Sequence, residues 1–471
     1  MRCVALIRLC LAAWVIAAVP AKAQDDTQAL RQELDAMRQA VERLQRRLDT
    51  LEQGAGRAAP SVAAATAAQA SAPVAAPADV ADIAASALPQ RASVADPSTA
   101  ASRPDSAAGP TDPGLAGFFA VPGTDTLIRL GGYAKLDAIA DSRASGNEDQ
   151  FIPSSMPLGA PGRNGSNVSM HAKQTRFSVE ARRPTTRGNL RFYLENDFFG
   201  SSDDYAFRLL HAYGQLGNVY AGYGYSSFMD PDSLPDTLDF AGPGGAAYLL
   251  VAGIHTSFAM GTGNTLTIAV EDPDTELVDD ASARMPVNRL PDVTLVARME
   301  RNGGHLQFGA VLRSLGYHDD EARDREFAGG LQVSGSASVG ERDLLLFGVL
   351  GGRGLGRYTA ELTGSGLDAV AGLDGRLEVL DLRGGFVGYT HYWSDTWRSN
   401  LVLGQLTLER NGALASEVFR QSRYGVINLL WSPAASWTMG MELLYGRLEQ
   451  QGGTRGETAR LQGSVQYKFI K

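Results

Sequence analysis

The chain has 471 residues, including 53 glycines, and its formal net charge is −9. A nucleic-acid-binding protein needs a basic footprint, so this acidic balance argues against that class. Beyond the N-terminus no apolar run reaches the ~18 residues of a membrane-spanning helix, which excludes a helical membrane protein. Both cysteines, Cys3 and Cys10, lie at the start of the chain. The remainder therefore offers no disulfide, thiolate metal site or Cys nucleophile.

Residues 1–23 have the three parts of a secretory signal peptide. Arg2 and Arg8 supply positive charge, Leu9–Val19 is an apolar stretch, and Ala21-Lys22-Ala23 is a small-x-small cleavage site. This pattern predicts export and a mature chain that begins at Gln24, with a net charge of −12. The alternative is a cytoplasmic helix.

Residues 24–53 carry a narrow apolar stripe. Its members are spaced alternately by four and three residues, the period of a coiled-coil seam. They are Leu30, Leu34, Met37, Val41, Leu44, Leu48 and Leu51. The polar flanks favour self-association over an amphipathic helix packed on its own domain, and the seam alone leaves dimer and trimer open. Residues 54–116 are rich in Ala and Pro without aromatic residues, which predicts a flexible linker.

Residues 117–471 change to the period of a β-strand. Stretches such as Arg460–Phe469 alternate apolar and polar side chains, as strands do when one face is apolar and the other wet. Sixteen such segments are expected. They start near Leu127, Met170, Gly188, Tyr205, Asn218, Tyr248, Gly263, Leu290, Gly304, Phe327, Arg342, Arg376, Thr396, Glu417, Ser436 and Thr458.

Short and long connections alternate between these segments. Gly217–Asn218 is a short turn, whereas Met229–Ala247, Gly316–Glu326 and Glu449–Glu457 are expected long loops. A sheet with an apolar outer face must close in lipid, because each unpaired backbone group there costs several kcal/mol. Outer-membrane barrels carry short periplasmic turns and longer external loops. The pattern predicts an all-β fold, a 16-stranded antiparallel transmembrane β-barrel with a short N-terminal α-helical coiled coil. A soluble β-sandwich or propeller would not sort its loops by parity.

Aromatic side chains gather beside the short turns, where an interfacial girdle is expected. They are Tyr389, Tyr392, Trp393, Trp397, Trp431, Trp437, Tyr467 and Phe469.

Charged residues on the wet face are the candidates for selectivity, because a barrel of sixteen strands encloses an aqueous channel. The basic candidates are Arg129, Lys135, Arg176, Arg182, Arg191, Arg208, Arg298, Arg313 and Arg383, and the acidic ones are Asp137, Glu180, Glu195, Asp197, Glu300 and Asp381. The basic majority and the planar fork of Arg favour small anions. The alternative is that these groups merely pair across strands.

The loop Met229–Ala247 is the predicted constriction, because its Pro and Gly residues allow it to fold inward. It carries Asp230, Asp232, Asp236 and Asp239, which fit no Ca²⁺-loop signature and are expected to be solvated. If these acids line the narrowest point, they argue against simple anion selectivity. No metal or cofactor site is expected.

His255-Thr256-Ser257 is the one hint of an enzyme. Outer-membrane lipases carry His and Ser two residues apart on a strand, but here that face is expected to point into the lumen. No third group that would orient a base can be assigned, so the chain is not expected to be an enzyme.

Several short motifs resemble the DcaP-like family of outer-membrane porins. They are Gly132–Asp137, Thr175–Glu180, Tyr193–Gly200, Arg208–Gly214, Ser226–Asp230 and Asp239–Gly244. The chain departs from that family at Leu210, where Arg is common, and at its Phe469-Ile470-Lys471 end, where an aromatic residue is usual.

The resemblance implies an outer-membrane homotrimer with a periplasmic coiled coil that passes small anionic solutes such as dicarboxylates by diffusion. Barrel-insertion machinery and outer-membrane lipid are the other implied partners. The phosphate-selective porin family is a near relative and the alternative solute class. A membrane-anchored tether or adhesin without transport is the alternative from another class.

Overall fold

The computed structural model describes residues 117–159, 164–200, 204–278, 285–318, 323–372 and 375–469. The predicted signal peptide, coiled-coil seam and linker therefore lie outside the described residues.

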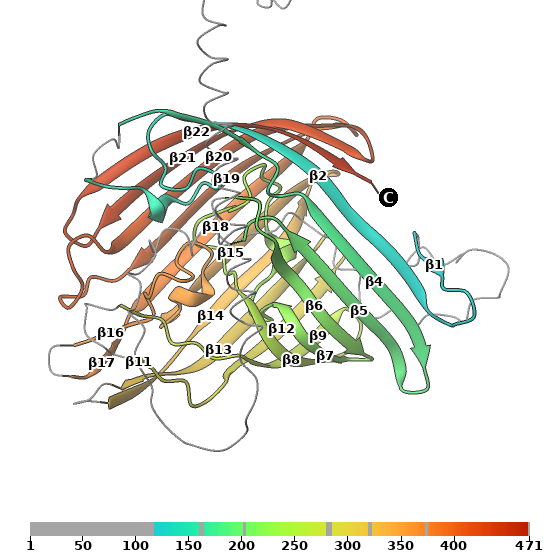
Figure 1. Ribbon diagram of the computed structural model, residues 1–471, viewed down its shortest axis with the longest axis horizontal. Helices are drawn as coiled ribbons and strands as arrows, with labels where there is room; N and C mark the ends of the chain where they lie inside the picture. Colours follow the sequence, from blue (N-terminus) through green and yellow to red (C-terminus); the bar gives the residue numbers. More distant parts are fainter. Residues whose placement is uncertain are drawn as a thin grey trace, which may run out of the picture. The chain divides into compact units, whose positions relative to one another are not determined.

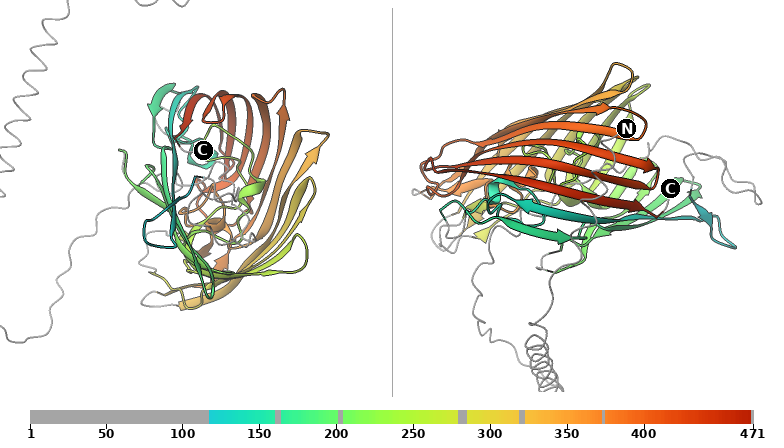
Figure 2. Two further views of the ribbon diagram at one scale, coloured as in Figure 1. Left: turned by 90° about the vertical axis from the view of Figure 1, so that its right-hand side faces the viewer. Right: turned by 90° about the horizontal axis from the view of Figure 1, so that it is seen from above.

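A closed antiparallel β-barrel is the main body of the described chain, as predicted (Figures 1 and 2). Its sheet has nineteen strands among the described residues, and three of these are short additions to a barrel of sixteen. The sixteen are β2 (Leu127–Asp141), β4 (Arg176–Thr185), β5 (Gly188–Asp197), β6 (Arg208–Leu216), β7 (Val219–Tyr225), β8 (Leu250–Ala259), β9 (Asn264–Glu271), β12 (Asp292–Arg301), β13 (Gly304–His318), β14 (Arg323–Val339), β15 (Asp343–Arg353), β18 (Asp381–Tyr392), β19 (Trp397–Leu408), β20 (Phe419–Ala434), β21 (Trp437–Gln450) and β22 (Arg455–Lys468).

The barrel closes between its first and last strands. In the second half of β2, Asp137 pairs with Ser464 of β22 on one side and with His171 of β3 (Asn167–His171) on the other. The first half of β2 pairs with β4. β3 and β4 are thus one strand position interrupted by residues 172–175. The other two additions are β1 (Phe119–Ala120) and β11 (Met285–Pro286), which pair with β2 and β13.

The short and the long connections between strands lie at opposite ends of the barrel, as predicted. Seven tight turns in the described chain, such as Asn302–Gly303, join successive members of the sixteen barrel strands at one end, the turn end. Gly303 has a φ of +97°, which the Asn-Gly pair of a two-residue hairpin supplies without strain. The opposite end, the loop end, carries the longer connections. Among these are L1 (residues 142–166), L3 (226–249), L4 (272–291) and L6 (354–380).

Two predicted long loops are wrong. β13 and β14 pair as far as His318 and Arg323, through most of Gly316–Glu326. β21 and β22 pair as far as Glu449 and Arg455, which form an ion pair of 2.8 Å, so Glu449–Glu457 is mostly strand. Polar residues mark the end of the apolar belt there rather than the end of the strands, because a barrel strand can continue into water with its ladder intact.

Short elements lie within the loops that fold inward. η2 (Pro153–Ser155), η3 (Pro231–Ser233) and η4 (Gly356–Tyr358) are 3-10 turns in L1, L3 and L6. β10 (Leu277–Val278), β16 (Ala369–Ala371) and β17 (Leu377–Val379) form a small separate sheet that joins L4 to L6.

Apolar side chains cover the outer face, because period-2 strands present alternate residues to each side. Ile427 and Leu429 of β20 are exposed, whereas Asn428 between them is buried inside. At the turn end, Trp397 and Trp431 stack with ring centroids 5.6 Å apart. These exposed rings lie where the interfacial girdle was predicted. Among the described residues no helix is long and apolar enough to cross a membrane.

Candidate functional site in the barrel lumen

L3 lies inside the barrel, as its Pro and Gly content predicted. Phe228 and Asp230 are almost fully buried, although both belong to a connection between strands. Buried loop residues need partners for their polar groups, and these partners come from the inner wall.

The first half of L3 is fixed by Asp230. One carboxylate oxygen accepts a hydrogen bond from Nη1 of Arg298 on β12 at 2.9 Å. The other oxygen contacts Nε2 of His305 on β13 at 2.8 Å and Oγ of Ser334 on β14 at 2.7 Å. Asp232 binds the same guanidinium at 2.8 Å. One acidic side chain thus joins L3 to three adjacent strands.

The second half of L3 is fixed by Asp236 and by backbone groups. Asp236 binds Arg398 of β19 at 2.5 Å and 2.8 Å. The carboxylate of Glu442 on β21 accepts hydrogen bonds from the backbone N–H groups of Leu238 and Asp239 at 2.7 Å and 2.9 Å. Each predicted constriction acid therefore faces a cationic or backbone partner. This corrects the expectation of solvated carboxylates for Asp230 and Asp239, which are buried, whereas Asp232 and Asp236 remain partly exposed.

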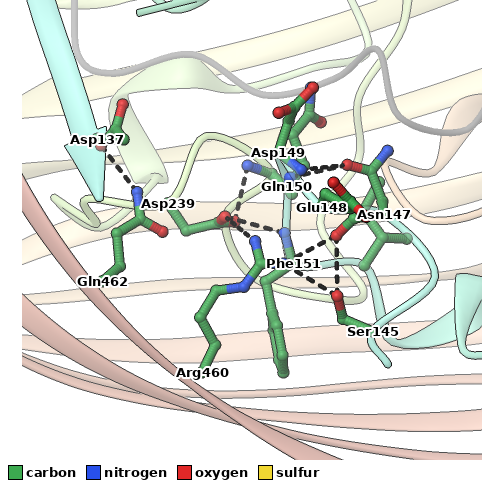
Figure 3. A network of polar contacts seen from close by, with 12 residues as sticks. Asp137, Ser145, Asn147, Glu148, Asp149, Gln150, Phe151, Asp239, Arg460 and Gln462 are labelled. Atoms are coloured by element: carbon green, nitrogen blue, oxygen red, sulfur yellow. Dashed lines mark hydrogen bonds and ion pairs between the residues drawn. The ribbon is translucent and has the colours of Figure 1, made fainter. Parts of the chain in front are cut away.

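Arg460 of β22 connects L1 with L3 (Figure 3). Its side chain is fully buried and holds the Asp141 carboxylate through Nε and Nη2 at 2.7 Å and 2.8 Å. Nη1 lies 3.8 Å from Asp239, and the guanidinium stacks on the Phe151 ring of L1 at 5.4 Å. The Asp239 carboxylate also accepts the backbone N–H of Phe151 at 2.9 Å.

L6 is anchored by a second buried arginine. Arg313 of β13 binds Asp292 of β12 at 3.0 Å and Asp368 of L6 at 2.8 Å. The Tyr358 hydroxyl donates to Glu271 and Asp292. Arg313, predicted as a selectivity residue, is 2% exposed and acts as a structural anchor.

The inner face is not polar on every strand, which corrects the prediction that polar side chains line the inside of the whole barrel. L1, L3 and L6 contribute Phe151, Phe228 and Leu362 to a buried apolar cluster. The wall contributes inward side chains from β15, β18, β19, β20 and β21, namely Leu350, Leu382, Val402, Leu406, Val426 and Leu444. Loops that fold inward bury their own apolar side chains, and this requires apolar residues on the wall that they contact. The inner faces of these strands therefore carry apolar side chains beside polar groups such as Asn428 and Glu442.

The opposite wall keeps a group of partly exposed arginines. Glu180 of β4 is 1% exposed and binds three of them: Arg129 Nη2 at 2.5 Å, Arg182 Nε at 2.8 Å and Arg191 Nε at 2.7 Å. The three side chains remain 33%, 25% and 20% exposed. We call these four residues the arginine cluster. It carries three positive charges against one negative charge and lies toward the turn end.

The remaining basic candidates are paired with acids on neighbouring positions. Arg208 binds Asp197 at 2.5 Å and 2.8 Å. Arg176 lies 3.7 Å from Glu195. Lys135 lies 3.2 Å from Asp137 and donates to the backbone oxygen of Leu238 in L3. Arg298 also binds Glu300 at 2.6 Å. Ion pairing with nearby acids, either across strands or along one strand, thus describes most of the predicted set.

Two predicted lumen residues face outward. Asp381 and Arg383 are exposed, whereas Leu382 between them is buried in the apolar cluster inside. The polar face was assumed to be the inner face, and it is not at this end of β18 because L6 packs against the wall there. Leu210 is fully buried.

Sequence reasoning missed several anchors. The strand period places Arg398, Glu442 and Arg460 on the inner face, but nothing in the sequence shows which loop reaches them. Phe118, which stacks on Arg129 and Arg182, precedes the first predicted strand and gave no signal.

His255 stacks on Tyr220 at 4.2 Å inside the barrel, and Ser257 binds Thr267. In the described chain, no group of three His, Cys, Asp or Glu side chains is placed to hold a metal ion.

Glu361 of L6 provides a pH-dependent contact. Its carboxylate accepts hydrogen bonds from the Ser154 backbone N–H of L1 at 2.9 Å and from Ser422 Oγ of β20 at 2.6 Å. Burial raises the pKa of Glu361 from 4.5 to about 7, and the two hydrogen bonds offset only part of this rise. The folded state then binds more protons than the unfolded state between these values, so stability falls as pH rises through this window.

We expect the wild-type barrel to unfold at a higher temperature at pH 5 than at pH 8. The Glu361 contribution is on the order of 3 kcal/mol. Glu361→Gln, which mimics the protonated acid, should reduce this difference, as measured by tryptophan fluorescence on heating in detergent. An unchanged pH difference in the variant would show that the pKa of Glu361 is not raised.

Comparisons with known proteins agree with this geometry. The family model described as DcaP outer membrane protein matches residues 120–469. The crystal structure of the outer membrane channel DcaP of Acinetobacter baumannii is similar with a TM-score of 0.66 and 20% identity, covering 74% of this chain and 99% of that one. An anion-selective porin from Comamonas acidovorans has a TM-score of 0.51 and 9% identity, covering 73% and 100%. No curated protein matches the sequence.

Proposed function

Because the chain belongs to the DcaP outer membrane protein family, we propose that it is a porin that passes small hydrophilic solutes by diffusion and prefers anions of the dicarboxylate type. The arginine cluster carries this proposal. Its excess of two positive charges attracts anions, and walls of low dielectric strengthen that field.

The hydrogen bonds of the cluster leave donors for a solute. Arg182 and Arg191 each contact Glu180 through Nε. Among the described residues, no acceptor is hydrogen-bonded to the terminal nitrogens of either side chain. A guanidinium presents such a pair of nitrogens to a carboxylate in a two-point contact. Two adjacent forks match the two carboxylates of a small dicarboxylate.

Wall arginines reduce the negative charge of the L3 acids. Arg398 pairs with Asp236, and Arg298 is shared by Asp230, Asp232 and Glu300. The proposed anion preference therefore requires the arginine cluster to outweigh the negative charge that remains around Arg298.

The proposed cellular setting follows from the sequence and the family. The chain would be exported by residues 1–23 and inserted into the outer membrane of a Gram-negative bacterium by the barrel-insertion machinery. The heptads at 24–53 would join three copies in the periplasm, connected through the linker at 54–116 to the barrel at 117–471. The transport role involves no chemistry on the solute.

The reversal potential of single channels in a KCl gradient tests the proposal. We expect anion preference in the wild type and its loss in the double variant Arg182→Gln with Arg191→Gln. Two charges at about 5 Å contribute about 1 kcal/mol after screening, so the chloride-to-potassium permeability ratio should fall about fivefold. Arg383→Gln, on the outer face, is the matched control and should leave the ratio unchanged.

Cation preference in the wild type, or an equal ratio in the double variant and the wild type, would refute the proposed selectivity. Current block by succinate and by phosphate distinguishes the dicarboxylate proposal from the phosphate-type alternative. Stronger block by succinate is expected.

A further inference from the structure

Phe118 lies where the described chain enters the barrel. β1 pairs with the start of β2 through Phe119 and Ala120, and a tight turn over residues 121–126 connects the two strands. Phe118 is 6% exposed and packs with Leu127, whereas its neighbour Phe119 is 51% exposed. Adjacent rings on the same short segment thus have opposite environments.

The Phe118 ring contacts two members of the arginine cluster. The guanidinium carbon of Arg129 lies 4.8 Å from the ring centroid, and that of Arg182 lies 5.1 Å from it. Cations at such distances are attracted by the face of an aromatic ring. A ring that touches both guanidinium groups keeps two like charges at fixed positions and occupies space that water or solute would otherwise fill.

We propose that Phe118 is a specificity-determining residue of this channel. Its ring narrows the turn end of the lumen beside the arginine cluster and fixes Arg129 and Arg182. It thereby limits the size of the anion that passes the cluster. This inference deepens the proposed function and rests on the cluster lining the solute path.

The ratio of single-channel conductance in potassium gluconate to that in potassium chloride tests this role. Phe118→Ala should raise the ratio about twofold, because a bulky anion gains more than chloride from a wider passage. Phe118→Leu keeps part of the volume and should give an intermediate ratio. Phe119→Ala is the matched control and should keep the wild-type ratio.

The inference is overturned if both Phe118 variants conduct gluconate and chloride in the wild-type ratio. If Phe118→Ala does not insert into bilayers, Phe118→Leu alone decides, and a wild-type ratio in it overturns the inference. The proposed function fails separately, through an unchanged reversal potential in the Arg182 and Arg191 double variant, because that readout reports charge rather than size.

Discussion

Asp230→Ala is expected to release the first half of L3 from the wall and to raise single-channel conductance with larger current fluctuations. The substitution removes contacts to Arg298, His305 and Ser334 together. Buried groups that lose a charged partner are strongly destabilised, so we expect a loss on the order of 3 kcal/mol in unfolding free energy. A loop without this anchor would sample positions nearer and farther from the arginine cluster.

Asp232→Ala is the matched control, because Asp232 lies in the same loop, binds the same arginine and remains 29% exposed. Its effect on conductance and stability should be small. Planar-bilayer recording of both variants measures the difference. Wild-type conductance and noise in Asp230→Ala would mean that the other contacts of L3 hold it in place without Asp230.

Arg460→Ala is expected to have the largest effect on stability. The guanidinium neutralises Asp141, approaches Asp239 and covers the Phe151 ring in a fully buried setting. Its removal leaves buried carboxylates without a cation, a change that costs about 3–5 kcal/mol. L1 and L3 lose their common anchor at the same time, so the variant should unfold at a much lower temperature or fail to refold in detergent.

Arg455→Ala on the same strand is the control, since its ion pair with Glu449 is exposed and contributes about 0–1 kcal/mol. Thermal unfolding followed by the shift between folded and unfolded gel mobility compares the two. Equal unfolding temperatures for Arg455→Ala and Arg460→Ala would contradict the role assigned to the buried network.

The barrel itself was predictable from the sequence, because lipid imposes period-2 patterning on every outer face. Ile427 and Leu429 alternate with Asn428 as the strand pattern requires. Turn residues such as Asn302–Gly303 also predict the backbone conformation of the turns that they form. Local chemistry therefore located the strands, apart from strand ends that continue past the apolar belt, as at Glu449 and Arg455.

The interior was less predictable, because loop packing depends on contacts between residues far apart in the chain. Asp230 and Ser334 are separated by 104 positions, and Asp141 and Arg460 by 319. No local pattern encodes such pairs. Leu382 faces inward in place of the predicted Asp381 and Arg383 for the same reason, because L6 supplies apolar partners inside the barrel. Of the predicted basic set, Arg129, Arg182 and Arg191 keep an excess of charge within one cluster.

Single-channel recording of the unmodified protein tests most directly whether the barrel holds a continuous aqueous path. Discrete current steps in KCl, with a reversal potential of the sign that chloride preference gives, are the predicted result. Inserted protein that carries no current would contradict the account. It would indicate that the inward loops close the lumen and that the barrel is a membrane anchor.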